Sequence, residues 1–224
     1  MGGNRGNLLP VYVMADESGS MTGVMGQLND GLRSLHEALL GEPMAAAKVR
    51  FSVLGFSDTV LEHLRLADLR REDEMPLLTP RNVTNYGAAF EDLARRIPAN
   101  VDALKGEGFT VHRPAVFFLS DGQPSYDGWH DAHRRLTDRS VTRGAPNIIA
   151  CGIGAAEAAT IRQVATREEY GFIAEAGVEV GAAIATFCTA LTKSIVESGR
   201  SLGSDQPELV VQRPEGFRMA IDVV

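Results

Sequence analysis

Five oxygen-bearing side chains stand where polar loops meet a strand-like or helix-like segment. Asp16, Ser18 and Ser20 follow the apolar run LLPVYVMA in the segment DESGS. Thr84 lies in NVTNYGAAF, just before a helical pattern, and Asp121 directly follows VFFLS. Such residues commonly close turns or cap helices, but carboxylates and hydroxyls are also ligands for a hard cation. The choice between these interpretations depends on whether the fold brings the five residues together.

The spacing within DESGS favours the cation. Residues at alternate positions of an extended or turning backbone can point the same way, so Asp16, Ser18 and Ser20 can converge on one point. Oxygen ligands with several waters suit Mg²⁺, and Mn²⁺ or Ca²⁺ are alternatives. The three segments do not offer the set of Cys and His side chains that Zn²⁺ prefers.

The elements that must position these residues alternate between apolar runs and helical patterns. This order is typical of an α/β protein with a doubly wound, mostly parallel sheet and helices on both faces. In such a sheet, ligands bind beyond the carboxyl ends of the strands, and the three polar loops are expected to open there. The six expected strands are residues 8–15, two strands within 48–69, the runs VFFLS and APNIIACGIG, and residues 170–174.

Turn and breaker residues predict how these elements connect. The two strands about Ser57-Asp58 should form a hairpin, which places one antiparallel strand at the sheet edge. A helix should run from Ala88 to about Arg96, where Pro98 should break it before a short continuation to Lys105. Apolar stripes predict further helices over 24–39, 129–139, 157–166 and 178–197. We expect one domain over residues 8–198, followed by a C-terminal extension over 199–224 that is a tail or an added hairpin.

Composition narrows the class of protein. The 224-residue chain carries a net charge of −7 at pH 7 and is 44% hydrophobic, as is typical of a globular protein. It lacks the basic surface that nucleic acid or an anionic membrane would require. No apolar run approaches membrane-spanning length and no signal-peptide core begins the chain, so we expect a cytoplasmic protein. Cys151 and Cys188 show no metal-binding spacing, and buried free thiols are favoured over a disulfide.

Motifs of several other functional sites are incomplete. CGIGAAEA begins like a dinucleotide-binding loop but lacks the third glycine. Neither Ser18 nor Ser20 stands in the Gly-x-Ser-x-Gly frame of a serine hydrolase. His130 and His133 lie three residues apart on one helix face, for which a solvated polar face is a better explanation than a metal site. The Gly-Lys-Ser/Thr loop that binds nucleotide phosphates is missing from the sequence.

Three segments carry a resemblance to a known family. VYVMADESGSM, VTNYGAAF and VFFLSDGQP resemble, in order and spacing, the three motifs of von Willebrand factor A (vWA) domains. In that family the motifs form the metal-ion-dependent adhesion site (MIDAS), whose first motif is Asp-x-Ser-x-Ser. The resemblance spans residues 8–198. Within the family, LPVYVMADESGSM and HRPAVFFLSDGQPSYD are most similar to the bacterial intracellular branch associated with tellurite resistance.

The resemblance implies a role for each matched residue. Ser18, Ser20 and Thr84 would contact the metal directly. Asp16 and Asp121 would act mainly through water and orient the direct ligands. Glu17 stands at a variable position of the motif and is expected not to face the metal.

The expected function is a protein-binding module and not an enzyme. A metal held mostly by neutral hydroxyls stays electrophilic, so it can accept an Asp or Glu carboxylate from a partner protein. The tellurite-associated resemblance implies partners in a bacterial stress response, and the oligomeric state is left open. The alternative is a Mg²⁺-dependent phosphatase or phosphotransferase with Asp16 as its nucleophile. Such an enzyme normally needs a cation near the phosphoryl group, and the nearest are Arg81 and Arg113.

Overall fold

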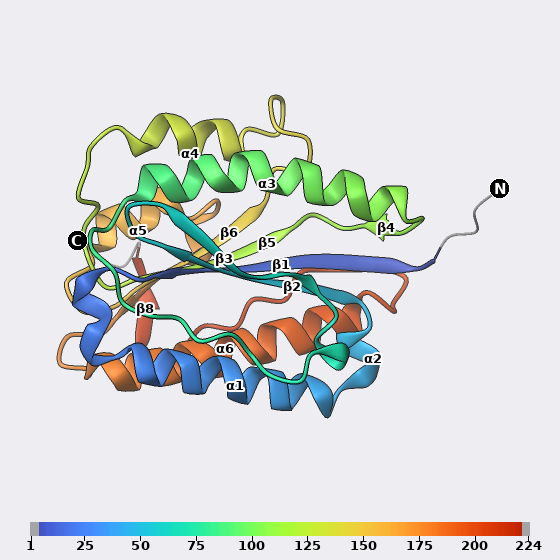
Figure 1. Ribbon diagram of the computed structural model, residues 1–224, viewed down its shortest axis with the longest axis horizontal. Coiled ribbons are helices and arrows are strands. Elements are labelled where there is room, and N and C mark those ends of the chain that lie inside the picture. The colour runs from blue at the N-terminus through green and yellow to red at the C-terminus, as the bar shows by residue number, and fades with distance from the viewer. Residues whose placement is uncertain (1–4, 221–224) are drawn as a thin grey trace.

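The computed structural model describes residues 5–220, which form a central sheet with helices on both sides (Figure 1). The middle of the sheet is β1 (Asn7–Asp16), in which every residue after the first is buried. Because side chains alternate along a strand, Val13 enters the core on one side of the sheet and Met14 enters the core on the other. A strand covered on both faces requires such a continuous apolar run.

The other strands are β2 (Val49–Phe56), β3 (Val60–Ala67), β4 (Thr110–Val111), β5 (Ala115–Ser120), β6 (Asn147–Gly152), β7 (Gly171–Ala174) and β8 (Phe217–Met219). They form one sheet in the order β3-β2-β1-β5-β6-β7-β8, with β4 paired to β1. β3 is the expected antiparallel edge strand, and β8 is a second one at the opposite edge. The doubly wound, mostly parallel α/β fold is confirmed, but within residues 5–220 the sheet has eight strands instead of six.

Helices cover both faces of the sheet. They are α1 (Met25–Leu40), α2 (Pro43–Ala46), α3 (Tyr86–Gly106), α4 (Trp129–Thr137), α5 (Ala158–Val164) and α6 (Val180–Ser201). α1, α2 and α6 pack on one face, and α3, α4 and α5 pack on the other (Figure 1). A short 3-10 helix, η1 (Gly19–Gly23), joins β1 to α1.

The expected helix break at Pro98 is wrong. α3 runs without interruption from Tyr86 to Gly106, with the proline inside it. Its buried face continues on both sides of the proline, with Ile97 before it and Val101 after it in the core. A proline within a helix costs about 3 kcal/mol, and the packing of this long apolar stripe against the sheet outweighs that cost.

α6 has the length and composition of a membrane span, with a mean hydropathy of 1.3 in its most apolar window. The sequence was expected to contain no apolar run of this length, and polar residues such as Thr192 and Lys193 do interrupt the helix. Its expected apolar face is confirmed, because Ile184, Phe187 and Leu191 are buried against the sheet. α6 therefore packs as a core helix of the domain.

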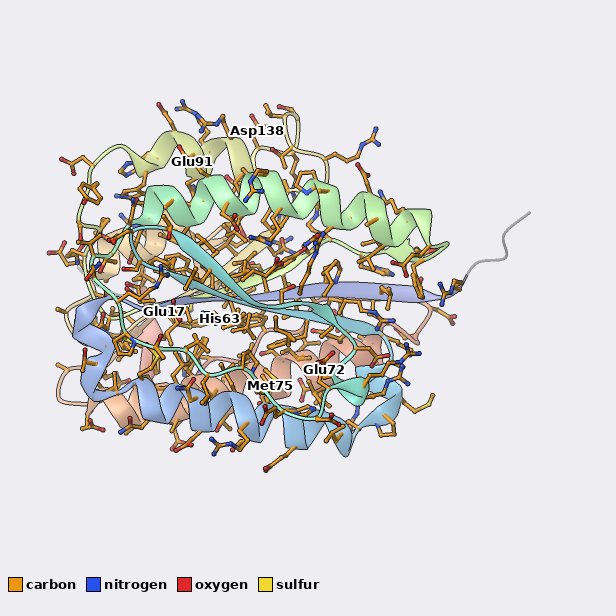
Figure 2. All side chains as sticks on the ribbon, viewed as in Figure 1. Glu17, His63, Glu72, Met75, Glu91 and Asp138 are labelled. Carbon is orange, nitrogen blue, oxygen red and sulfur yellow. The ribbon has the colours of Figure 1, made fainter. Side chains whose placement is uncertain are left out.

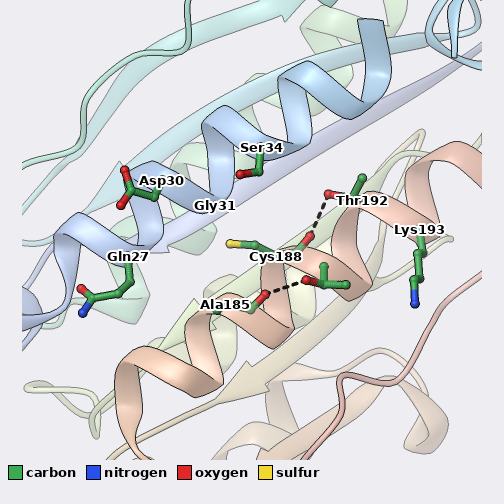
Figure 3. Close-up of a pocket in the computed structure, with 9 residues that line it drawn as sticks. Gln27, Asp30, Gly31, Ser34, Ala185, Cys188, Thr192 and Lys193 are labelled. Atoms are coloured by element: carbon green, nitrogen blue, oxygen red, sulfur yellow. Dashed lines mark hydrogen bonds between the residues drawn. The ribbon is translucent and has the colours of Figure 1, made fainter. Parts of the chain in front are cut away.

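α1 and α6 approach each other closely beside a groove of about 530 Å³ (Figure 3). Cys188 on α6 faces Gly31 on α1, and a Cβ atom on Gly31 would lie 2.3 Å from the Cys188 Sγ. Cys188 and Cys151 are both free and buried, which confirms the expectation for the thiols. Burial raises the pKa of Cys188 to about 12, so this thiol stays neutral and acts as a packing group.

The segment after α6 folds back onto the domain. The Ser198 hydroxyl donates to the Val210 carbonyl at 3.2 Å and accepts from the Val210 amide at 2.9 Å. After this pair of hydrogen bonds, β8 pairs with β7 and extends the sheet. The division into a domain ending at residue 198 and an extension stays a prediction, and residues 221–224 of that extension lie outside the described part.

Candidate metal centre

The five predicted site residues gather where the direction of strand order reverses. From β1 the sheet continues to β2 and β3 on one side, and to β5 and β6 on the other. Asp16 is the last residue of β1, and Asp121 follows the last residue of the neighbouring strand β5. The crevice between such strands, beyond their carboxyl ends, is where open α/β sheets bind ligands.

Hydrogen bonds join four of the five residues into one cluster. The Ser20 hydroxyl donates to Asp121 Oδ1 at 2.7 Å, and the Ser18 and Ser20 hydroxyls lie 2.9 Å apart. Asp16 Oδ1 accepts from the backbone amide of Ser18 at 2.8 Å, which closes the turn. The same residues therefore form both the turn after β1 and the hydrogen-bonded cluster. Residues from two separate loops, 101 positions apart, meet here.

Thr84 borders this cluster from a third loop. The backbone of its neighbour Asn82 accepts from the Gly19 amide at 2.8 Å, which ties the Thr84 loop to the first loop. The Thr84 carbonyl also accepts from the Ser125 amide, and the Thr84 amide donates to the Ser125 hydroxyl, which ties Thr84 to the loop after β5. Its hydroxyl lies 3.9 Å from the position of a Cβ atom on Gly122, the residue after Asp121. Thr84 is thus placed beside the cluster, without a direct hydrogen bond to the other four side chains.

Ser120 is a site residue that the sequence did not reveal. Its hydroxyl donates to Asp16 Oδ2 at 2.6 Å and so fixes the second carboxylate oxygen. Both residues are fully buried. The available signal was a hydroxyl side chain at the last position of an otherwise apolar strand, directly before Asp121.

The two carboxylates of the cluster, Asp16 and Asp121, lie in surroundings that disfavour their charged forms. Burial raises the pKa of Asp16 to about 6, against hydrogen bonds from Ser120 and Ser18 that lower it, and the charge of Asp121 adds to the rise. Burial also raises the pKa of Asp121, against the hydrogen bond from Ser20. Poorly solvated carboxylates that repel each other favour a neighbouring cation, so this donor set fits a divalent metal.

The donor set is one of hydroxyls supported by carboxylates. Among residues 5–220, no three His, Cys, Asp or Glu side chains gather in a way that could hold a metal ion. Any metal at this edge would therefore depend on the oxygens of Ser18, Ser20 and Thr84 together with Asp16 and Asp121. Hard cations accept such ligands readily.

Glu17 turns away from the cluster. It is completely buried, and its carboxylate lies beside His63 of β3 (Figure 2), with Oε1 2.8 Å from the His63 Nε2. The two atoms do not form a hydrogen bond, and the contact is an ion pair only when the histidine is protonated. The Arg81 Nε donates to Glu17 Oε2 at 2.9 Å. A Cβ atom on Gly55 would overlap the Glu17 carboxylate, at 2.2 Å from its carbon.

The other cations and histidines considered from the sequence have separate partners. Arg81 also donates to the carbonyls of Gly55 and Thr59. His130 bonds Gln163, and His133 bonds the Val164 carbonyl, each through Nε2 at 2.8 Å. The expectation of a solvated face is wrong for His133, because its ring also packs on Phe90 with centroids 5.0 Å apart.

An acidic hollow of about 450 Å³ lies next to the Thr84 loop. The exposed ring of Tyr126 borders it, and Arg135 is the cation in its lining. Its carboxylates are those of Asp58, Glu91, Asp127 and Asp131. A partner bound at the cluster would meet this negative surface.

The sequence matches no protein-family model and no curated protein. Solved structures do share the fold. Proximal thread matrix protein 1 from the mussel byssus has a TM-score of 0.59 at 15% identity, over 87% of this chain and 49% of that one. A von Willebrand factor type A protein from Catenulispora acidiphila has a TM-score of 0.50 at 16% identity, over 85% of this chain and 43% of that one. The chain has the fold of a vWA domain.

Two further observations concern other solved structures that share the fold. The pilus adhesin SpaC from Lactobacillus rhamnosus GG has a TM-score of 0.65 at 10% identity, over 87% of this chain and 31% of that one. Another structure of the mussel protein, with a TM-score of 0.59 at 14% identity, has a zinc-occupied MIDAS motif. In that protein a divalent metal fills the motif. This vWA-fold chain spans about half the length of the mussel protein, 49%.

Proposed function

We propose that this vWA-fold chain is a protein-binding module that depends on a divalent metal. The observation that carries the proposal is the hydrogen-bonded contact of Ser20 with Asp121, supported by Ser18 and Asp16. It brings two loops together at the sheet crevice with oxygen groups only. Zinc in the MIDAS motif of the mussel neighbour supports the same use of this edge.

Each site residue has a defined part in the proposal. Ser18, Ser20 and Thr84 supply neutral hydroxyl oxygens, while Asp16 and Asp121 orient those hydroxyls and the intervening waters. Bound Mg²⁺ would supply a positive charge that these neutral ligands leave largely uncompensated, and a partner Asp or Glu carboxylate would be attracted to it.

The surroundings of the site suggest what else the partner carries. The hollow beside Thr84 is rich in carboxylates, including Asp58 and Asp127. A partner with further negative charges facing this hollow would be repelled, because like charges placed against each other across an interface are unfavourable. We therefore propose a partner whose coordinating carboxylate is flanked by Lys or Arg. From the resemblance of the sequence motifs, we also propose that the protein acts in a cytoplasmic bacterial stress response of the tellurite-resistance type.

The phosphatase or phosphotransferase alternative needs a cation near the phosphoryl group, and neither of the two arginines considered for it, Arg81 and Arg113, is placed to serve. Arg81 is occupied by Glu17 and by two backbone carbonyls. Arg113 precedes β5 and so lies at the opposite end of that strand from Asp121, where it donates to the Ala145 carbonyl. These contacts support a binding module over an enzyme.

Thermal unfolding with and without metal tests the proposal. After removal of metals with a chelator, saturating Mg²⁺ should raise the Tm by about 5 °C, because a ligand of the folded state stabilises it. Parallel titrations with Mn²⁺, Ca²⁺ and Zn²⁺ would identify the preferred ion. Asp121→Asn should abolish the rise. Asp127→Asn is the matched control, since it removes an exposed carboxylate from the same loop, and it should keep the rise.

Two results would contradict the proposal. The first is that none of the metals tested shifts the Tm of the wild-type protein. The second is that Asp121→Asn and Asp127→Asn show the same change in Tm when metal is added. Turnover of a phosphate ester that is lost in Asp121→Asn would instead favour the enzymatic alternative. If the metal effect holds, a pull-down with carboxylate-bearing peptides that contain or lack flanking lysines would test the nature of the partner.

A further inference from the structure

A second polar pocket lies at the amino ends of the strands, opposite the candidate metal centre. It has a volume of about 220 Å³. Its walls come from the start of β1, the segment before β5, the start of β6 and the chain that follows α6. Three arginines line it, Arg113, Arg139 and Arg167, together with His112 and Asn147.

Most of the positive charge in this pocket is uncompensated. Within residues 5–220, Arg113 and Arg139 form no ion pair with a carboxylate, and Arg167 has only a loose contact of 3.5 Å with Glu169. Burial lowers the pKa of Arg113, and the charge of Arg139 lowers it further, so these guanidinium groups repel each other. Glu208 also borders the pocket, without an ion pair to any of the three. Clustered guanidinium groups of this kind are suited to an oxyanion.

Two polar atoms in the same pocket lack hydrogen-bond partners. Asn147 is 7% exposed, and its side-chain Oδ1 has no partner among the described residues. The His112 Nε2 is likewise buried and unpartnered, and burial lowers the pKa of this histidine. A buried acceptor without a partner is costly. Asn147 Oδ1 therefore requires a donor, such as a hydroxyl group, from whatever fills the pocket.

We propose that this pocket binds a small phosphomonoester that also carries hydroxyl groups. The phosphate would lie against Arg113 and Arg139, because a guanidinium group donates two parallel hydrogen bonds to phosphate oxygens. The hydroxyl groups would donate to Asn147 Oδ1 and reach His112. A pocket of about 220 Å³ is smaller than the usual drug-sized site, which favours a ligand of a few carbons. The proposal does not depend on the metal centre.

Isothermal titration calorimetry with glycerol 3-phosphate as the probe tests the proposal. A chelator in the buffer keeps divalent cations away from the metal centre, so a failure of the metal hypothesis leaves this experiment unaffected. Glycerol 3-phosphate should bind, inorganic phosphate should bind more weakly, and glycerol should not bind. No heat of binding and no Tm shift with glycerol 3-phosphate would overturn the proposal, and so would equal affinity for inorganic phosphate.

Two arginines on the segment between α4 and β6 form a matched pair of variants. Both Arg139 and Arg143 are exposed, but only Arg139 lines the pocket. Arg139→Gln should weaken binding by about tenfold, the usual effect of removing a charged hydrogen bond, and Arg143→Gln should leave it unchanged. Equal affinities in the two variants would place the anion elsewhere. Asn147→Ala should remove the preference for glycerol 3-phosphate over inorganic phosphate, and a retained preference would contradict the role of Oδ1.

Discussion

Asp16 and Glu17 are neighbours in sequence, and their carboxylates leave the backbone in different directions. Asp16 accepts from Ser18 and Ser120 at the crevice, whereas Glu17 enters the core beside β3. The alternation of side chains predicted that Asp16, Ser18 and Ser20 converge, and the motif resemblance predicted that Glu17 does not face the metal. Its partners could not be predicted, because Arg81 is 64 residues away and belongs to a loop without regular structure. The local alternation of residues indicates to which side a side chain points, but it does not indicate which distant residue it contacts.

The buried pair of Glu17 and Arg81 gives a prediction about stability. Arg81→Ala should lower the free energy of unfolding by about 3 kcal/mol, because it leaves a buried carboxylate without its main partner. The control is Arg33→Ala, which removes an exposed pair with Asp30 and should cost less than about 1 kcal/mol. Urea unfolding of both variants measures the difference. An equal loss of unfolding free energy in the two variants would mean that the buried pair contributes no more to stability than the exposed pair.

His133 gives a prediction about pH. Burial lowers its pKa and the charge of His130 lowers it further, against the hydrogen bond to Val164. Because the unfolded chain then binds the proton more readily, stability is complete above the ordinary histidine pKa of about 6.5 and falls as the pH drops below it. Stability stops falling once the pH is below the pKa of the folded state.

Replacing His133 tests this assignment. His133→Gln keeps a side-chain donor for the Val164 carbonyl but cannot be protonated. The fall in Tm between about pH 7.5 and about pH 5.5 should be smaller in this variant than in the wild-type protein. If both proteins lose the same number of degrees, the acid sensitivity belongs to other groups.

At the scale of elements, the strands and loops that build the site were predictable, because continuous apolar runs such as LLPVYVMA end at polar loops. Parallel strands then bring those loops to one edge. The elements that sequence reasoning missed are of two kinds. β4 is only two residues long and shows no usable alternation, and the three residues of β8 lie in an extension that was expected only as a tail or an added hairpin. The continuity of α3 depends on packing of its whole stripe, which outweighs the local effect of Pro98.

The contact of α1 with α6 makes a prediction about helix packing (Figure 3). Alanine normally favours a helix over glycine by about 1 kcal/mol. Gly31→Ala should nevertheless destabilise by about 1–3 kcal/mol, because the added methyl group would overlap Cys188. Gly26→Ala, in the same helix but with open space around it, should be neutral or stabilising. Adding Cys188→Ala to Gly31→Ala should restore part of the loss, as measured by urea unfolding. A Gly31→Ala variant as stable as Gly26→Ala would show that the helices adjust freely.

At the scale of the whole molecule, the sheet separates two proposed binding sites. The metal centre lies beyond the carboxyl ends of β1 and β5, and the arginine pocket lies at their amino ends. The six residues of β5 alone span roughly 20 Å. Sites this far apart without shared residues usually act independently.

Independence of the two sites can be measured directly. If both ligands bind, the stabilisation by Mg²⁺ and that by glycerol 3-phosphate should add to within about 0.5 kcal/mol. The affinity for glycerol 3-phosphate should also be the same with and without Mg²⁺. A change of more than about threefold, beyond the effect expected for uncoupled sites, would mean that the sheet transmits binding from one end to the other.

We expect the short strand β8 to affect how copies of the protein meet in concentrated solution. It covers the outer edge of β7, whose Phe172 and Ile173 are apolar. An uncovered edge presents a row of free amide and carbonyl groups that can recruit a strand from another molecule. A chain shortened before Phe217 should therefore form aggregates that light scattering detects, at concentrations where the intact chain does not. The three residues of β8 would then serve chiefly as protection against self-assembly.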